Sequence, residues 1–159
     1  MARIRWKDRA RELLPMVEQI REVVKDYPPA VMMTVVSYSR DIGASVSLTV
    51  SSKRDDFLDG KVGAVSYTVQ RTRAFENPEF DPPPADRHSR RRDWERMASR
   101  LSPIASQLET WLNGASERFH SASVAVDMMQ PWIIFFVLDL PRRQLSGEIG
   151  DVSYLLIDA

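Results

Sequence analysis

The chain contains no cysteine and only six glycines among its 159 residues. Without cysteine it can form no disulfide, carries no thiol nucleophile and cannot hold zinc through thiolates. The few glycines form no glycine-rich loop of the kind that cradles phosphate groups, which argues against nucleotide-driven chemistry. The absence of cysteine also fits a reducing compartment, and we expect a cytoplasmic protein.

The chain also has no excess of positive or negative charge and no long apolar run. Lysine plus arginine and aspartate plus glutamate both number 22, so the formal net charge is zero, and 43% of the residues are apolar. A neutral chain is poorly suited to coating nucleic acid or an anionic membrane. The longest apolar run, Trp132 to Leu138, is far shorter than the roughly 20 residues that span a bilayer. We therefore expect a single domain with a buried core and no membrane partner.

The sequence repeats itself at an offset of 88 residues. The aligned pairs are Trp6 with Trp94, Ala10 with Ala98, Leu13 with Leu101, Pro15 with Pro103, Gln19 with Gln107, Ile20 with Leu108 and Val24 with Leu112. Further along, Val65-Ser66-Tyr67 recurs as Val152-Ser153-Tyr154 at an offset of 87. So constant a register predicts the duplication of a whole folding unit, with repeats over 1–71 and 93–159 inside one domain. Residues 72–92, rich in proline and charge, are predicted to be the linker.

Each repeat is predicted to open with an amphipathic helix, because apolar residues recur at steps of three and four from Trp6 and again from Trp94. Pro15 predicts a kink near Arg11 or a helix that restarts at Pro15. Asn113-Gly114 predicts a bend in the second helix or its end. Three strands should follow each helix, at 30–39, 44–52 and 62–71, and at 121–128, 132–139 and 151–158. Residues 40–43 and 59–61 are predicted to be hairpin turns.

The fold class that follows is α+β, a duplicated αβββ unit with pseudo-twofold symmetry. Its antiparallel sheet or sheets would carry the two long helices on one face. This topology resembles that of sliding-clamp domains and of gyrase-inhibitor-like ligand-binding domains, although those families usually add a strand before each helix. A shared topology does not by itself carry a function.

Two strands of the first repeat alternate apolar with hydroxyl residues, which predicts a sheet with one buried and one wet face. The predicted wet face is formed by Ser45, Ser47, Thr49, Ser66 and Thr68, and the alternative is that these residues form a flat polar binding surface. The strand from Trp132 to Leu138 is instead apolar on both sides and needs cover on both. This cover could come from the helix layer and the packing between the repeats, which would make it a buried central strand. Alternatively, Trp132, Ile133, Phe135 and Phe136 are interaction residues that contact a protein partner or a second copy of the chain.

Signals for catalysis are weak. His88 and His120 have no metal-ligand spacing, and no serine sits in a nucleophile elbow, so we expect no catalytic residue, metal or cofactor. Asp59-Gly60-Lys61, with Asp41 upstream, matches the tail of a metal-dependent nuclease core, but Asp-Gly favours a turn instead. The arginine cluster Arg87, Arg90, Arg91 and Arg92 could meet phosphates or an acidic partner. The adjacent acidic stretch favours pairing within the linker, so nucleic acid is not the expected partner.

The sequence therefore predicts a non-enzymatic protein-binding module: an adaptor, an inhibitor or immunity-type protein, or an assembly component. It would act through its sheet face or as a homodimer. The first alternative is a small-molecule sensor with a ligand groove between the repeats, where the equivalent residues Tyr67 and Tyr154 would lie. The second alternative is a metal-dependent hydrolase that uses Asp41, Asp59 and Lys61.

Overall fold

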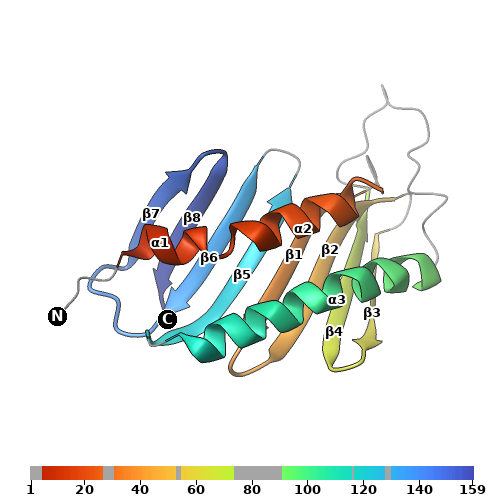
Figure 1. The fold of residues 1–159 in the computed structure, drawn as a ribbon. Coiled ribbons are helices and arrows are strands. Elements are labelled where there is room, and N and C mark those ends of the chain that lie inside the picture. Colours follow the sequence, from red (N-terminus) through yellow and green to blue (C-terminus); the bar gives the residue numbers. More distant parts are fainter. Residues whose placement is uncertain (1–4, 27–30, 53–54, 74–90, 116, 128–129) are drawn as a thin grey trace.

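The computed structural model describes residues 5–26, 31–52, 55–73, 91–115, 117–127 and 130–159. They form an eight-stranded sheet with helices on one face, a mixed α and β fold (Figure 1). The helices are α1 (Trp6–Arg11), α2 (Leu14–Val24) and α3 (Arg91–Gly114). The strands are β1 (Val31–Ser39), β2 (Gly43–Ser51), β3 (Asp56–Val62), β4 (Val65–Thr72), β5 (Phe119–Asp127), β6 (Pro131–Val137), β7 (Gln144–Ile149) and β8 (Val152–Asp158).

All six predicted strands are present, but the predicted αβββ unit is wrong because β3 and β7 are additional strands. The turn predicted at Asp59-Gly60-Lys61 lies inside β3, and the chain reverses after it, where Gly63 has a φ of 61°. The turn predicted at 40–43 is correct, since β1 ends at Ser39 and Gly43 has a φ of 88°.

The strand order is β3-β4-β2-β1-β5-β6-β8-β7. We call residues 5–73 the first half and residues 91–159 the second half; β1 and β5 pair antiparallel at the centre and join them. The prediction of an antiparallel sheet is wrong for two pairs, because β2 pairs with β4 and β6 pairs with β8 in parallel. The two additional strands explain this, since each turns the chain once more before the last strand of its half enters the sheet.

The prolines have different effects on the helices: the chain is divided into two helices near Pro15, but one helix continues through Pro103. α1 ends at Arg11 and α2 restarts at Leu14 with Pro15 in its first turn, as predicted, because proline needs no hydrogen-bond donor there. Pro103 lies inside the continuous helix α3, which ends at Gly114 as predicted.

Each helix mainly covers strands of the other half. α3 packs on β1, β2, β3 and β4, whereas α1 contacts β7 and α2 contacts β5 (Figure 1). Arg9 of α1 also donates to the buried Glu117 carboxylate at 2.7 Å, and this bond raises the pKa of Arg9 above its ordinary value. The two halves therefore share one core.

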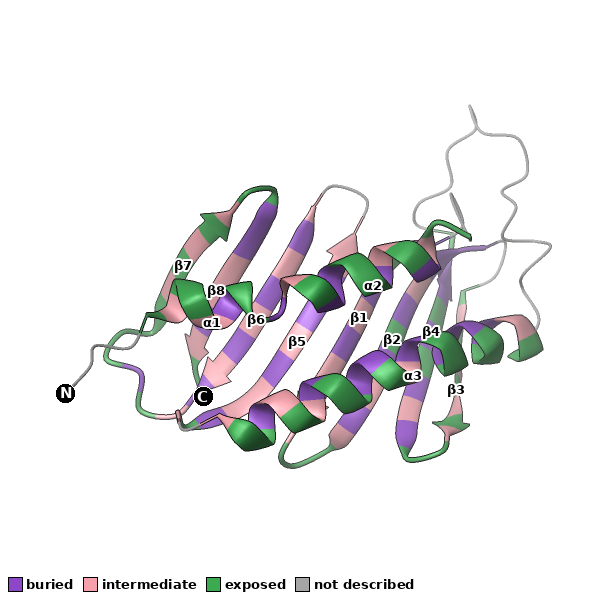
Figure 2. Cartoon of the chain, in the orientation of Figure 1, coloured by how far each residue is buried: buried purple, intermediate pink, exposed green. Residues whose placement is uncertain are grey.

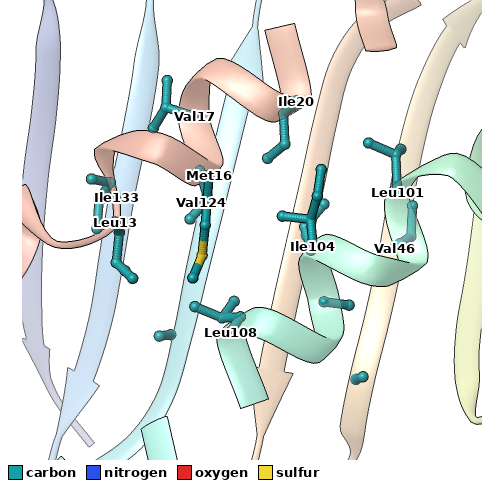
Figure 3. Close-up of a cluster of buried hydrophobic side chains, with 14 of the residues drawn as sticks. Leu13, Met16, Val17, Ile20, Val46, Leu101, Ile104, Leu108, Val124 and Ile133 are labelled. Atoms are coloured by element: carbon teal, nitrogen blue, oxygen red, sulfur yellow. The ribbon is translucent and has the colours of Figure 1, made fainter. Parts of the chain in front are cut away.

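That core lies between the helices and the sheet (Figure 3). Its helical members include Leu13, Met16, Val17, Ile20, Leu101, Ile104 and Leu108, and its strand members include Val46, Val124 and Ile133. Burial alternates along the strands (Figure 2), because successive side chains of a strand point to opposite faces of the sheet. One face is thus packed against helices, and no helix of the described residues lies on the other (Figure 1).

A glycine and a tyrosine face each other at both ends of the sheet. Gly60 on β3 pairs with Tyr67 on β4, and Gly147 on β7 pairs with Tyr154 on β8. A Cβ at Gly60 would lie 2.5 Å from the Tyr67 hydroxyl, and the Tyr154 ring occupies the same space at Gly147. Each glycine is therefore needed because a larger side chain would clash with the tyrosine ring. Aromatic rings commonly cover glycines of a neighbouring strand in this way.

We predict that Gly60→Ala lowers the free energy of unfolding by about 1–3 kcal/mol, the range for overpacking a core. Gly147→Ala should cost less, because the Tyr67 ring is only 2% exposed whereas Tyr154 is partly exposed and can move. Urea unfolding curves of the two variants measure the difference.

Gly114→Ala is the matched control, since a Cβ there meets no atom within 4 Å and alanine favours the helix. It should not lower the free energy of unfolding. Equal losses in Gly60→Ala and Gly114→Ala would contradict this explanation.

Candidate functional site

The sheet surface opposite the helices, here called the open face, gathers most of the residues that sequence analysis selected. On β2 and β6 the side chains that alternate with the buried core residues point to it. Strand register therefore decides which open-face side chains are neighbours.

The open face of the first half is rich in hydroxyl groups. The parallel pairing of β2 with β4 places three pairs side by side, and we call these six residues the hydroxyl band: Ser45 with Ser66, Ser47 with Thr68, and Thr49 with Gln70. Ser47, Thr68 and Gln70 are exposed, and the other three are partly exposed. The structure thus brings together all five residues of the predicted wet face.

The open face of the second half is apolar. β6 and β8 pair in parallel, so that Ile134 lies beside Leu155 and Phe136 beside Ile157, with Trp132 next to Ser153. We call Trp132, Ile134, Phe136, Leu155 and Ile157 the apolar band. All five are partly exposed.

The predicted interaction strand is divided between the two faces. Trp132 and Phe136 lie on the open face, but Ile133 and Phe135 are 0% exposed and belong to the core. Phe135 stacks on Trp111 of α3 with ring centroids 5.4 Å apart. The prediction that Ile133 and Phe135 contact a partner is therefore wrong. Ile134, Leu155 and Ile157 were missed, although strict alternation from Trp132 would have selected Ile134.

Between the bands, β1 and β5 carry smaller and mixed side chains. The hydroxyls of Ser37 and Ser123 lie 2.7 Å apart, and one donates to the other. Met33 on β1 is 39% exposed. The two bands are thus separated by the central pair of strands.

Charged side chains occur at the margins of the open face. Asp59 and Lys61 are on the edge strand β3, Glu148 is on the edge strand β7, and Asp127 ends β5. Their registers place them on the same side of the sheet as the two bands. Within the described part of the chain, the middle of the open face carries no charge.

The two tyrosines predicted to share a groove are not brought together. Tyr67 is on β4 and Tyr154 is on β8, and four strands lie between them in the sheet order. Their predicted place at the junction is wrong because each half inserts its last strand one position from the outer edge. Tyr67 is buried and its hydroxyl donates to Glu95 at 3.1 Å.

Tyr154 instead lines a pocket between α1 and the strands β7 and β8, with a volume of about 430 Å³. Trp6 forms another wall, and the cationic residues Arg5 and Lys7 lie at its margin. Asp8, which also lines the pocket, accepts a bond from Arg11 at 3.0 Å. The pocket combines aromatic rings with positive charge.

The residues of the hydrolase hypothesis are divided between two places. Asp41 lies in the turn between β1 and β2 and pairs with His120 at 2.7 Å, whereas Asp59 and Lys61 are on the edge strand β3. Among the described residues, no group of three or more His, Asp or Glu side chains is arranged to hold a metal ion. His88 lies outside the described residues.

The arginine cluster is seen only in part. Arg87 and Arg90 lie outside the described residues, whereas Arg91 and Arg92 begin α3 and are exposed. Arg91 donates to the backbone carbonyl of Asp59 at 2.7 Å and so fastens the start of α3 to β3. Arg91, one of the arginines predicted to meet phosphates, therefore has a structural role in joining α3 to β3.

No helix within the described ranges is long and apolar enough to cross a bilayer. Comparisons of the chain with protein-family models, with curated proteins and with solved structures find no match.

Proposed function

We propose that the chain is an internal duplication with a pseudo-twofold axis through its centre, and that its second half has acquired a protein-binding surface. At such an axis, equivalent residues should meet each other. Gln107 donates to Gln19 at 3.0 Å in the helix layer, and Val36 lies opposite Val124 in the sheet. Both pairs are 88 residues apart, the offset of the sequence repeat. The strand order also reads alike from either edge, which supports the same inference.

The observation that carries the functional proposal is the difference between the two bands. Strand register makes Ser47 and Thr68 the counterparts of Ile134 and Leu155. The hydroxyl band indicates that this fold is compatible with a polar open face. Folding alone therefore does not require the apolar residues on the open face of the second half, and we infer that they serve binding. Partly exposed apolar side chains gathered on one surface are typical of a contact with another macromolecule.

The protein is thus a non-enzymatic binding module that acts through the open face of its sheet, as an adaptor, an inhibitor or an assembly component. The apolar band supplies most of the affinity, because Trp132 and Phe136 are large aromatic side chains of the kind that dominate interface energies. The hydroxyl band and the uncharged centre of the open face favour a protein partner over a polyanion, because polyanion binding depends on positively charged side chains.

Site-specific photo-crosslinking in the producing cell tests the proposal. A photoreactive amino acid at Ile134 should give a crosslinked protein adduct, because this side chain would lie inside the contact. The same amino acid at Ser106 on α3, which is exposed on the opposite side of the molecule, is the matched control. Gel electrophoresis with mass spectrometry would measure and identify the adducts.

An adduct several times more abundant at position 134 than at position 106 is the expected result. Equal yields at the two positions, or no adduct at either, would remove the support for a binding role of the open face.

A second candidate function, small-molecule binding, is favoured by the pocket at Tyr154. The sequence offset makes Lys7 the counterpart of Glu95, which accepts a hydrogen bond from the hydroxyl of Tyr67. At the Tyr154 pocket the corresponding position, Lys7, is cationic and lines the pocket with Trp6 and Tyr154. Aromatic walls with a cationic margin fit a small aromatic carboxylate.

Benzoate is a suitable first probe for this candidate. Its binding should shift the indole N–H resonance of Trp6 in NMR spectra and leave that of Trp132 unchanged. Lys7→Glu, which gives this position the charge of its counterpart Glu95, should weaken the binding up to about fivefold, as expected for the loss of one exposed charge contact of about 1 kcal/mol. Unshifted resonances at millimolar benzoate would count against the pocket as a site for this ligand class.

A further inference from the structure

We propose that the partner on the open face is a second copy of this chain, and that the two copies pack open face to open face around a twofold axis. This inference rests on the proposed function of the open face and adds the identity of the partner. The size, chemical pattern and charge of the face support it.

The area of the open face is that of a stable interface. Eight strands spaced about 4.8 Å apart span about 38 Å, and strands of about seven residues at 3.3 Å each are about 23 Å long. The product, roughly 900 Å², is close to the about 800 Å² per partner of a standard protein–protein interface. The apolar band covers only part of this area, so a stable contact must include the hydroxyl band as well.

The chemical pattern of the face is self-complementary. A twofold axis that runs across the strands, in the plane between two stacked sheets, places each strand over its own copy. The apolar band then meets the apolar band, and the hydroxyl band meets the hydroxyl band. A hydroxyl both donates and accepts hydrogen bonds, so Ser47 and Thr68 can bond to the same residues of a second copy. A twofold axis parallel to the strands would instead place Trp132 and Phe136 of one copy against the hydroxyl band of the other copy.

The charges of the face also permit its contact with a copy of itself. Asp59 and Lys61 on one edge strand are of opposite sign, and Glu148 lies on the other edge strand. Asp127 ends β5, so an axis across the middle of the strands moves the copy of Asp127 to the opposite end of the interface. No row of like charges is therefore opposed to itself.

The resulting dimer is a four-layer sandwich of helices, two sheets and helices. Sheets that pack in this way lie about 10 Å apart with their strands inclined by about 30°. Ile134 stands between Trp132 and Phe136 on β6, and Ser47 stands between Ser45 and Thr49 on β2. Both residues are thus close to the axis, and each lies next to its own copy in the dimer.

The first experiment measures the solution mass of the full chain by light scattering over a hundredfold range of concentration. The chain has a mass of 18.2 kDa, and the expected result is twice that value at the upper end of the range. The double variant Ile134→Ser, Phe136→Thr gives the second half the side chains of the first half, which keeps the fold. It should raise the dissociation constant at least about a hundredfold, from the loss of two large apolar side chains on each copy. Ser106→Asp, on the exposed side of α3, should leave it unchanged.

The second experiment uses the absence of cysteine in the chain. Single variants Ile134→Cys and Ser47→Cys should each be joined to their own copies by a short bismaleimide, and Ser106→Cys should not. A mixture of Ile134→Cys and Ser47→Cys should give no mixed product, because the axis keeps the bands apart. A mixed product as abundant as the homotypic ones would overturn the proposed axis.

The outcomes separate this inference from the proposed function. A dimer whose dissociation constant is unchanged in the double variant would use another surface and would overturn the inference. A monomer at all concentrations, with photo-crosslinks from position 134 to a different protein, would overturn the second copy and leave the open face as a binding surface. A monomer without such crosslinks would overturn both.

Discussion

The antiparallel pairing of β1 with β5 is the contact on which the rest of the structure depends. It makes one sheet of the two halves and brings α3 over β1 to β4, while α1 and α2 reach β7 and β5. Neither half would keep its helical cover if this pair separated, because the helices lie mainly on the strands of the other half. Because the helices of each half pack on strands of the other half, their apolar stripes contribute to one shared core. A shared core unfolds as one cooperative unit.

The same arrangement leaves the two faces of the sheet under different constraints. On the helix side, both halves have the same glycine–tyrosine contact, Gly60 with Tyr67 in one and Gly147 with Tyr154 in the other. On the open face, no helix of the described residues limits side-chain choice, and here the hydroxyl and apolar bands differ. A surface that differs between halves of otherwise similar construction is where we place the function.

The sequence alone predicted what depends on local periodicity. The stripes from Trp6 and Trp94, the break at Pro15 and the alternation around Ser47 correspond to observed helices and strands. β3 and β7 were missed because Gly60 resembles a turn glycine, and its actual role depends on a tyrosine from another strand. The positions of Tyr67 and Tyr154 depend on strand order, which periodicity does not contain. In β6, where both faces are apolar, sequence could not separate Phe135 from Phe136, which packing against Trp111 decides.

In the proposed contact, the hydroxyl band would give the open face selectivity that an entirely apolar face would lack. Burying Ser47 or Thr68 against an apolar surface would leave hydroxyls without partners, at about 1–3 kcal/mol for each buried group. The apolar band favours burial by about 25 cal/mol for each Å² of apolar surface removed from water. A partner gains from both bands only if it is apolar over β6 and β8 and polar over β2 and β4. Because specificity is a difference between affinities, the penalty at the hydroxyl band would exclude from the proposed contact those partners that the apolar band alone would accept.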